Sequence, residues 1–219
     1  MLPARCPGCG RSGALVCDRC AATLAPAPDA PAPPPLAWWT ACFAYEGVAR
    51  ELVARAKYRN ERRFLGLVAH EVVRRLEGAP APIDLITWAP ASAARIRAQG
   101  VDHAELLARA VARLSGVRVA HCLYRLSGRA QTGLHASDRR AGPQLRAVRR
   151  LGGATVLVVD DVATTGGTLA AAARALRNAD CQAGAVFAAT IARTPRPGAA
   201  RKARAYTPAT PVGTREPTR

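Results

Sequence analysis

The stretch VLVVDDVATTGGTL at residues 156–169 constrains the fold more than any other part of the chain. Four apolar residues predict a buried strand, which runs directly into Asp160 and Asp161. Three threonines and two glycines follow, and a helical pattern then begins. A strand, a small-residue loop and a helix in this order are typical of a ligand site at the carboxyl end of a parallel sheet.

The residue types in this stretch indicate a ligand with two chemically different ends. Glycines let the backbone approach a phosphate closely, and the amide groups at a helix start favour an anion. The predicted phosphate loop comprises Ala163, Thr164, Thr165, Gly166, Gly167 and Thr168. Asp160 and Asp161 would repel a phosphate, but they suit sugar hydroxyls or a hydrated Mg²⁺. A ribose 5-phosphate meets both demands.

Two other nucleotide-binding patterns are missing from the sequence. Neither lysine, Lys57 or Lys202, lies in a GxxxxGK[ST] loop, and no GxGxxG follows a predicted strand. Adjacent aspartates are common at strand ends, so the pair alone would be a weak signal. The specific signal is the full order of apolar strand, paired aspartates and Thr/Gly loop.

Strand and helix patterns alternate through residues 36–194, which predicts an α/β fold with a mainly parallel sheet flanked by helices. The predicted strands are 38–47, 83–90, 117–126, 154–161 and 183–193. The predicted helices are 48–58, 61–77, 102–116 and 167–179, with Asp102 as N-cap and Gly116 near the end of the third. Residues 127–144 show no period and read as a long loop.

Three further segments differ in composition from this α/β region. Residues 1–24 hold four of the seven cysteines and predict a small module. Residues 25–35, APAPDAPAPPP, predict an extended, semi-rigid linker. Residues 195–219 are rich in Pro, Arg and Thr and predict a basic, disordered tail.

Further anion-binding candidates lie in the turn after the second predicted strand and in the long loop. Ala91 and Ser92 would let amide groups face a pyrophosphate, and Arg95 would neutralise it. The long loop contributes Arg129, Arg139 and Arg140, which could stabilise a leaving group. An ordinary turn and surface loop with solvated arginines remains the alternative for both segments.

The chain resembles the ComF family (competence protein F, or double zinc ribbon), a group of type I phosphoribosyltransferases. The resemblance rests on the four-cysteine module, VLVVDDVATTGGTL, PAS…RIRAQG…AELLAR and RAQTGLHASDRR, and covers roughly residues 5–194. It implies a type I phosphoribosyltransferase-like sheet and binding of phosphoribosyl pyrophosphate with Mg²⁺. It also implies that Asp160 and Asp161 hold the ribose hydroxyls at the catalytic centre. The chain departs from the family at residues 100–103, GVDH, where Gly-Phe-Asn-Gln is usual.

Two CxxC pairs predict a metal site in the N-terminal module. Cys6 and Cys9 form one pair, and Cys17 and Cys20 form the other. Four cysteines at this spacing suit a closed, structural Cys₄ zinc site in a segment too small for its own core. A redox CxxC is the less favoured alternative.

The net charge of +17 leaves two function classes open. One is an enzyme that transfers a phosphoribosyl group, for nucleotide salvage or in DNA uptake. The other is a non-catalytic accessory protein that senses phosphoribosyl pyrophosphate or binds single-stranded DNA beside a competence helicase. Codon bias alone could also produce the excess of Arg over Lys. With no signal segment and no long apolar run, we expect a soluble, cytoplasmic protein without membrane insertion.

Overall fold

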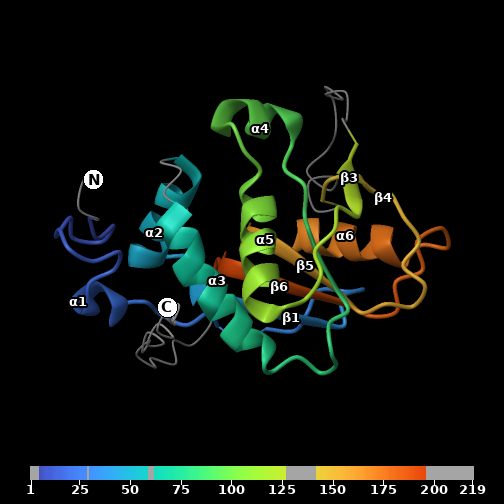
Figure 1. Cartoon of the computed structure of the whole chain (residues 1–219), viewed down its shortest axis with the longest axis horizontal. Helices are drawn as coiled ribbons and strands as arrows, with labels where there is room; N and C mark the ends of the chain where they lie inside the picture. Colours follow the sequence, from blue (N-terminus) through green and yellow to red (C-terminus); the bar gives the residue numbers. More distant parts are fainter. Residues whose placement is uncertain (1–4, 29, 59–61, 127–141, 196–219) are drawn as a thin grey trace, which may run out of the picture.

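The computed structural model describes residues 5–28, 30–58, 62–126 and 142–195 (Figure 1). The predicted tail and Arg129, Arg139 and Arg140 of the long loop therefore lie outside the described residues, apart from Pro195.

A four-stranded parallel sheet forms the centre of the molecule. Its strands run in the order β1 (Trp38–Ala44), β6 (Val186–Arg193), β5 (Val156–Ala163) and β2 (Leu85–Trp88). Asp160 of β5 pairs with Thr190 of β6, and Trp88 of β2 pairs with Val159. All of β6 and the first four residues of β5 are buried, as their apolar sequences predict. The predicted parallel α/β sheet is confirmed.

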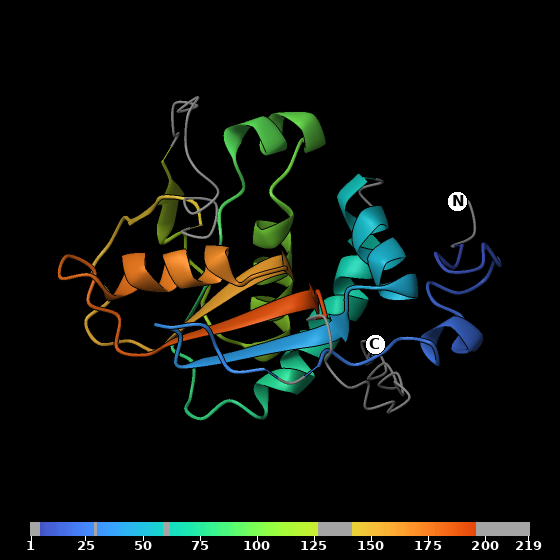
Figure 2. The same ribbon diagram turned by 180° about the vertical axis from the view of Figure 1, so that it is seen from behind.

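Helices cover both faces of the sheet (Figures 1 and 2). The helices are α2 (Gly47–Tyr58), α3 (Arg62–Leu76), α5 (His103–Ser115) and α6 (Gly167–Arg177). Phe64 and Val72 of α3 share one buried cluster with Leu107 of α5, whereas Leu169 of α6 belongs to a second cluster on the opposite face. Asp102 caps α5, and Gly116 ends it in the left-handed conformation, as predicted. Within the described residues, no helix is long and apolar enough to cross a membrane.

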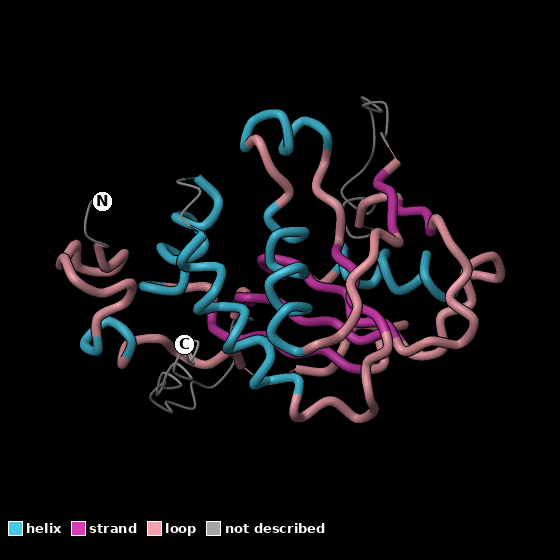
Figure 3. Tube along the Cα trace, in the orientation of Figure 1, coloured by secondary structure: helices cyan, strands magenta, loops and turns pink. Residues whose placement is uncertain are grey.

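The segment predicted as a strand at 117–126 is divided in the structure. Val119 makes one parallel bridge with Ile86 of β2, after which the chain leaves the sheet. Leu123–Arg125 then forms β3, which pairs antiparallel with β4 (Leu145–Ala147) in a separate ribbon. This ribbon stands beside the sheet (Figure 3).

One short helix was not predicted from the sequence. Helix α4 (Ala93–Gln99) follows β2, projects from the body and contains no buried residue (Figure 1). The oxygen Oγ of Ser92 caps it by accepting from the Arg95 amide, and Gly100 ends it with a φ of 77°. Its sequence, AARIRAQ, has no apolar face, so hydrophobic periodicity could not reveal it.

The N-terminal module and the Pro-rich segment pack against the sheet. The module contains one turn of helix, α1 (Asp18–Ala21). Leu24 is buried in the same cluster as Phe43, and Pro26 forms an antiparallel bridge with Phe43 beside the edge of β1. Since proline has no N–H, it suits a segment that covers a sheet edge.

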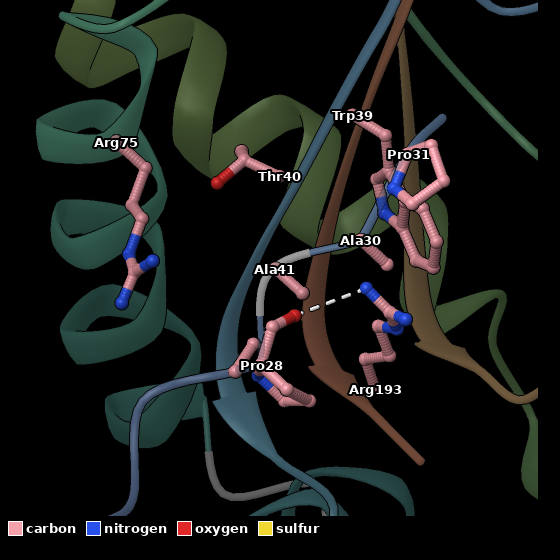
Figure 4. A pocket seen from close by; sticks show the side chains of 9 residues that line it. Pro28, Ala30, Pro31, Trp39, Thr40, Ala41, Arg75 and Arg193 are labelled. Carbon is pink, nitrogen blue, oxygen red and sulfur yellow. Dashed lines mark hydrogen bonds between the residues drawn. The ribbon is translucent and has the colours of Figure 1, made fainter. Parts of the chain in front are cut away.

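The Pro-rich segment then crosses the α6 face of the sheet. The Pro28 carbonyl accepts a 3.0 Å hydrogen bond from Arg193, whose guanidinium lies 4.7 Å from the centre of the Trp39 ring (Figure 4). Farther along, Leu36 is buried in the α6 cluster. The described residues of the predicted linker are therefore held against the body at several points.

Candidate functional site

A hollow of about 360 Å³ lies where the carboxyl ends of β2 and β5 meet their following loops. The sequence-predicted residues that line it are Ala91, Arg95, Asp160, Asp161, Thr164 and Thr168. These residues come from two segments more than sixty positions apart in the chain, and parallel pairing of β2 with β5 brings them together. The position agrees with the rule that ligands bind beyond the carboxyl ends of parallel strands.

Another hollow, of about 390 Å³, lies between the Pro-rich segment and β1 (Figure 4). It contains two guanidinium groups, but both have protein partners. Arg193 stacks on Trp39 and bonds to the Pro28 carbonyl. Arg75 bonds to Glu71 and to the Cys42 carbonyl. None of the described residues predicted to bind a ligand lines it, so the hollow at β2 and β5 is the candidate site.

The acidic pair is held in place by its own backbone. One oxygen of Asp160 accepts a 2.8 Å hydrogen bond from the Asp161 amide. One oxygen of Asp161 accepts a 2.6 Å bond from the Val162 amide. Asp161 is 8% exposed, so its carboxylate is largely shielded from water. Carboxylates restrained in this way are preorganised as acceptors for a bound polar ligand.

The Thr/Gly loop forms a tight turn between β5 and α6. Gly166 has a φ of 78°, a conformation that favours glycine, and its carbonyl accepts the first backbone bond of α6. The Thr165 hydroxyl accepts from the Gly167 amide at 3.3 Å. Thr164 and Thr168 line the hollow, whereas Ala163, Thr165, Gly166 and Gly167 shape the turn from outside its described lining.

The turn after β2 places only part of its predicted anion-binding surface in the hollow. Ala91 and Arg95 line it, and Ser92 instead caps α4. The Ala91 amide donates a 2.9 Å hydrogen bond to the Asp102 carboxylate. Asp102 itself lines the hollow and was predicted only as a helix cap.

Arg125 is a functional candidate that the sequence did not single out. It lies on β3 and lines the hollow together with Arg95 and Asp160. Burial lowers the pKa of Arg125, the neighbouring Arg95 charge lowers it further, and Asp160 opposes both effects. Two guanidinium groups close to one another form a suitable receptor for a multiply charged anion.

The four predicted metal ligands converge in the N-terminal module. The sulfur atoms of Cys6, Cys9, Cys17 and Cys20 all lie within 4.8 Å of one another. Those of Cys9 and Cys17 are 3.6 Å apart. Tetrahedral zinc with Zn–S bonds of about 2.3 Å would place its sulfurs about 3.8 Å apart. The cluster therefore has the donors and the spacing to hold a structural zinc ion.

The environment of the cluster also favours a cation. Burial tends to raise the pKa of Cys6, but backbone hydrogen bonds at Cys17, Cys9 and Gly8 outweigh it and lower the pKa to about 6. Burial and the neighbouring thiols of Cys17, Cys6 and Cys9 raise the pKa of Cys20 to about 12. Four thiols this close resist joint ionisation unless a metal ion neutralises them.

Comparison with protein families identifies the domain that carries the site. The model of the phosphoribosyl transferase domain matches residues 96–211, more than half of the chain. The chain belongs to the phosphoribosyl transferase domain family. The matched range includes the acidic pair and the Thr/Gly loop, so this family's domain forms one wall of the hollow. No curated protein matches the chain.

Several solved phosphoribosyltransferase structures resemble parts of the chain. Adenine phosphoribosyltransferase from Thermoanaerobacter pseudethanolicus shares 17% identity over 62% of this chain and 83% of its own, with a TM-score of 0.39. The Trypanosoma brucei enzyme in complex with AMP, pyrophosphate and ribose-5-phosphate shares 18% over 64% and 56%, with a TM-score of 0.41. The match to an allosteric regulatory enzyme of purine biosynthesis spans 25% of that enzyme, with 20% identity over 59% of this chain and a TM-score of 0.38.

Proposed function

We propose that the protein is a phosphoribosyltransferase that binds phosphoribosyl pyrophosphate in the hollow at the ends of β2 and β5. Asp160 and Asp161 would accept hydrogen bonds from the ribose hydroxyls, and residues 163–168 would wrap the 5′-phosphate. The observation that carries the proposal is that acceptors, hydroxyl donors and guanidinium groups line one cavity. Each part of the donor then meets the group that its chemistry requires.

In the proposed reaction, the bond between ribose C1 and pyrophosphate breaks as a nitrogen nucleophile bonds to C1. The nucleophile loses its proton to solvent water, and pyrophosphate carries away the bonding electrons. Arg95 and Arg125, which line the hollow, would stabilise the negative charge that develops on this leaving group. We assign the same role to Arg129, Arg139 and Arg140 if the long loop closes over the site.

Mg²⁺ fits this proposal as a partner of the donor. Asp160 and Asp161 would supply oxygen ligands of the kind that Mg²⁺ prefers, and a bound ion would neutralise negative charge on the donor. The roles of the chain itself are to position the ribose, shield C1 from water and receive the leaving group.

The acidic pair provides the test of the donor site. The double variant Asp160→Asn, Asp161→Asn should lose binding of phosphoribosyl pyrophosphate with Mg²⁺ in calorimetric titration, because an amide replaces an acceptor oxygen with a donor. Asp84→Asn is the matched control, since Asp84 bonds to the Thr155 amide at the opposite end of β5. An unchanged titration in the double variant would exclude the ribose assignment.

A screen of phosphoribosyl transfer to different nitrogen compounds tests which acceptor the protein uses. Purines, pyrimidines, ammonia and glutamine each offer a nitrogen nucleophile of a different kind. Release of pyrophosphate that depends on one of them would identify the acceptor class. Donor binding without transfer to any would favour a non-catalytic sensor of phosphoribosyl pyrophosphate.

We further propose that the chain is a ComF-like protein linked to DNA uptake. The support is the four-cysteine module joined to a phosphoribosyl transferase domain, together with the motifs shared with that family. Because four thiolate ligands require a reducing compartment, we place this activity in the cytoplasm.

A second candidate function is binding of single-stranded DNA as an accessory to a competence helicase. The observation that favours it is a set of exposed arginines on the zinc module, Arg5, Arg11 and Arg19, in a chain with a net charge of +17. Exposed arginines of this kind contact phosphates without reading bases.

A further inference from the structure

Asp102 places a carboxylate inside a hollow that we propose binds an anion. Its oxygen Oδ2 accepts a 2.9 Å hydrogen bond from the Ala91 amide. Its oxygen Oδ1 accepts from the amides of Ala104 at 3.1 Å and Glu105 at 3.4 Å. The side chain thus ties the turn after β2 to the first turn of α5.

The bond to Ala91 uses an amide that the sequence predicts as a pyrophosphate donor. Ala91 and Asp102 both line the hollow, so this bond is made at the ligand site. A backbone N–H donates one strong hydrogen bond in one direction. The Asp102 carboxylate and a pyrophosphate oxygen therefore compete for the same hydrogen atom.

Charge adds to this competition. Arg95 and Arg125 attract an anion into the hollow, whereas an ionised Asp102 repels it. Burial raises the pKa of Asp102, and the hydrogen bonds from Ala91, Glu105 and Ala104 counteract that rise. The three amides are thus the groups that offset the cost of keeping this carboxylate charged in a half-buried position.

We propose that Asp102 is a positioning residue that occupies the Ala91 amide in place of pyrophosphate and thereby weakens pyrophosphate binding. This inference rests on the proposed function, since it assumes that pyrophosphate enters the hollow. When pyrophosphate bonds to Ala91, Asp102 releases this amide and keeps its two bonds to α5. The turn after β2 therefore exchanges one anion for another instead of opening an empty site.

Two variants separate the bond to Ala91 from the helix cap. In Asp102→Asn, a single oxygen remains, and it can serve the α5 amides or Ala91 but not both. In Asp102→Ser, the shorter side chain retains a good N-cap and does not span to both partners. Both variants remove the negative charge. Glu105→Gln is the matched control, because it removes a charge from the same turn of α5 and Glu105 pairs with Arg109.

The experiment measures binding of inorganic pyrophosphate by calorimetry to the full chain and its variants. We expect Asp102→Ser to bind about tenfold more tightly, as one charge-assisted hydrogen bond becomes available to the ligand. Asp102→Asn should shift in the same direction, and Glu105→Gln should match the parent protein. Thermal unfolding of each variant checks that the fold is retained.

Amide hydrogen exchange at Ala91, followed by NMR without ligand, gives a readout that a helix cap alone would not move. We expect the Ala91 amide to be protected in the parent and in Glu105→Gln, and to exchange faster in Asp102→Ser. Equal or weaker pyrophosphate binding in both Asp102 variants, or unchanged exchange at Ala91, overturns the inference. Failure of every variant and of the parent to bind pyrophosphate overturns the proposed function instead.

Discussion

Two buried threonines, on the strands that flank β5, differ in how their hydroxyls are satisfied. The Thr87 hydroxyl on β2 accepts a 3.3 Å hydrogen bond from the Cys122 amide. The Thr190 hydroxyl on β6 is buried and has no hydrogen-bond partner among the described residues. A buried polar group without a partner costs about 1–3 kcal/mol.

We therefore expect Thr190→Val to raise the free energy of unfolding by about 1 kcal/mol, because a methyl group replaces the unpaired hydroxyl. Thr87→Val should lower it by a similar amount, since the Cys122 amide would lose its acceptor. Chemical denaturation of both variants measures these changes. A destabilised Thr190→Val variant would show that a water or ligand bonds to this hydroxyl.

Arg125 should contribute to anion binding through its charge and donors. Arg125→Ala is expected to weaken pyrophosphate binding roughly tenfold or more, as a hydrogen bond to a charged group is lost. Arg113→Ala is the control, because Arg113 lies in the last turn of α5, away from the capped end that lines the hollow. Calorimetric titration of both variants tests the assignment, and equal affinities would remove Arg125 from the site.

At the residue scale, local sequence predicted the acidic pair but not Arg125. Asp160 and Asp161 lie at the end of an apolar run, and the direction of the strand alone places them at the ligand edge. Arg125 reaches the hollow only because β3 leaves the sheet and pairs with β4. That pairing joins segments twenty residues apart, and no local period encodes it.

At the scale of elements, the four-cysteine module and the sheet share buried side chains. Leu24 is buried in the cluster that contains Phe43, and Leu15 and Val16 pack against the same cluster. A side chain at Gly8 would lie 2.8 Å from both the Cys20 sulfur and the Val48 side chain of α2. The metal site and α2 therefore meet across a close contact.

Removal of zinc should destabilise the whole protein. Exposure of two apolar side chains of the module would cost roughly 3 kcal/mol. For a chain of this size, the midpoint of thermal unfolding should then fall by roughly 10 °C after chelation. Calorimetry with and without a chelator measures this shift, and metal analysis gives the zinc content.

Cysteine variants provide the control for zinc removal. Cys17→Ser should lower both the zinc content and the unfolding midpoint. Cys181→Ala should retain the zinc, because Cys181 is buried near α6 and lies outside the sulfur cluster. An unchanged midpoint after complete zinc removal would show that the module docks without its metal.

The sequence predicted the long elements well and the short ones poorly. Helices α3, α5 and α6 each bury one face, so their periodicity is visible. Helix α4 buries no residue, and β3 and β4 have three residues each. Short elements without a buried face depend on caps and on distant partners, and neither produces a hydrophobic periodicity in the sequence.

At the scale of the whole molecule, the salt dependence of DNA binding shows whether the positive charge binds nucleic acid or reflects codon bias alone. If Arg5, Arg11 and Arg19 contact DNA phosphates, binding of a single-stranded oligonucleotide should weaken with salt. Three such contacts predict a slope of roughly −2 in a plot of log affinity against log salt. Fluorescence anisotropy over a range of salt concentrations measures this slope.

A variant with alanine at all three positions is the comparison for this measurement. It should bind more weakly and with a shallower slope, while its zinc content stays that of the parent. Equal slopes for the parent and the variant would show that these arginines do not contact DNA and that their charge reflects composition alone.

The Pro-rich segment connects the two ends of the molecule along a defined path. Pro26 lies beside Phe43, Pro33 lies against Gly166 of the Thr/Gly loop, and Leu36 is buried near the start of β1. A flexible linker tolerates insertions because its ends are free to move apart. Here the number of residues between Leu24 and Leu36 must match the distance between two buried sites. A deletion in this segment would therefore withdraw one of these leucines from the interior, and an insertion would do the same or bulge out beside the Thr/Gly loop.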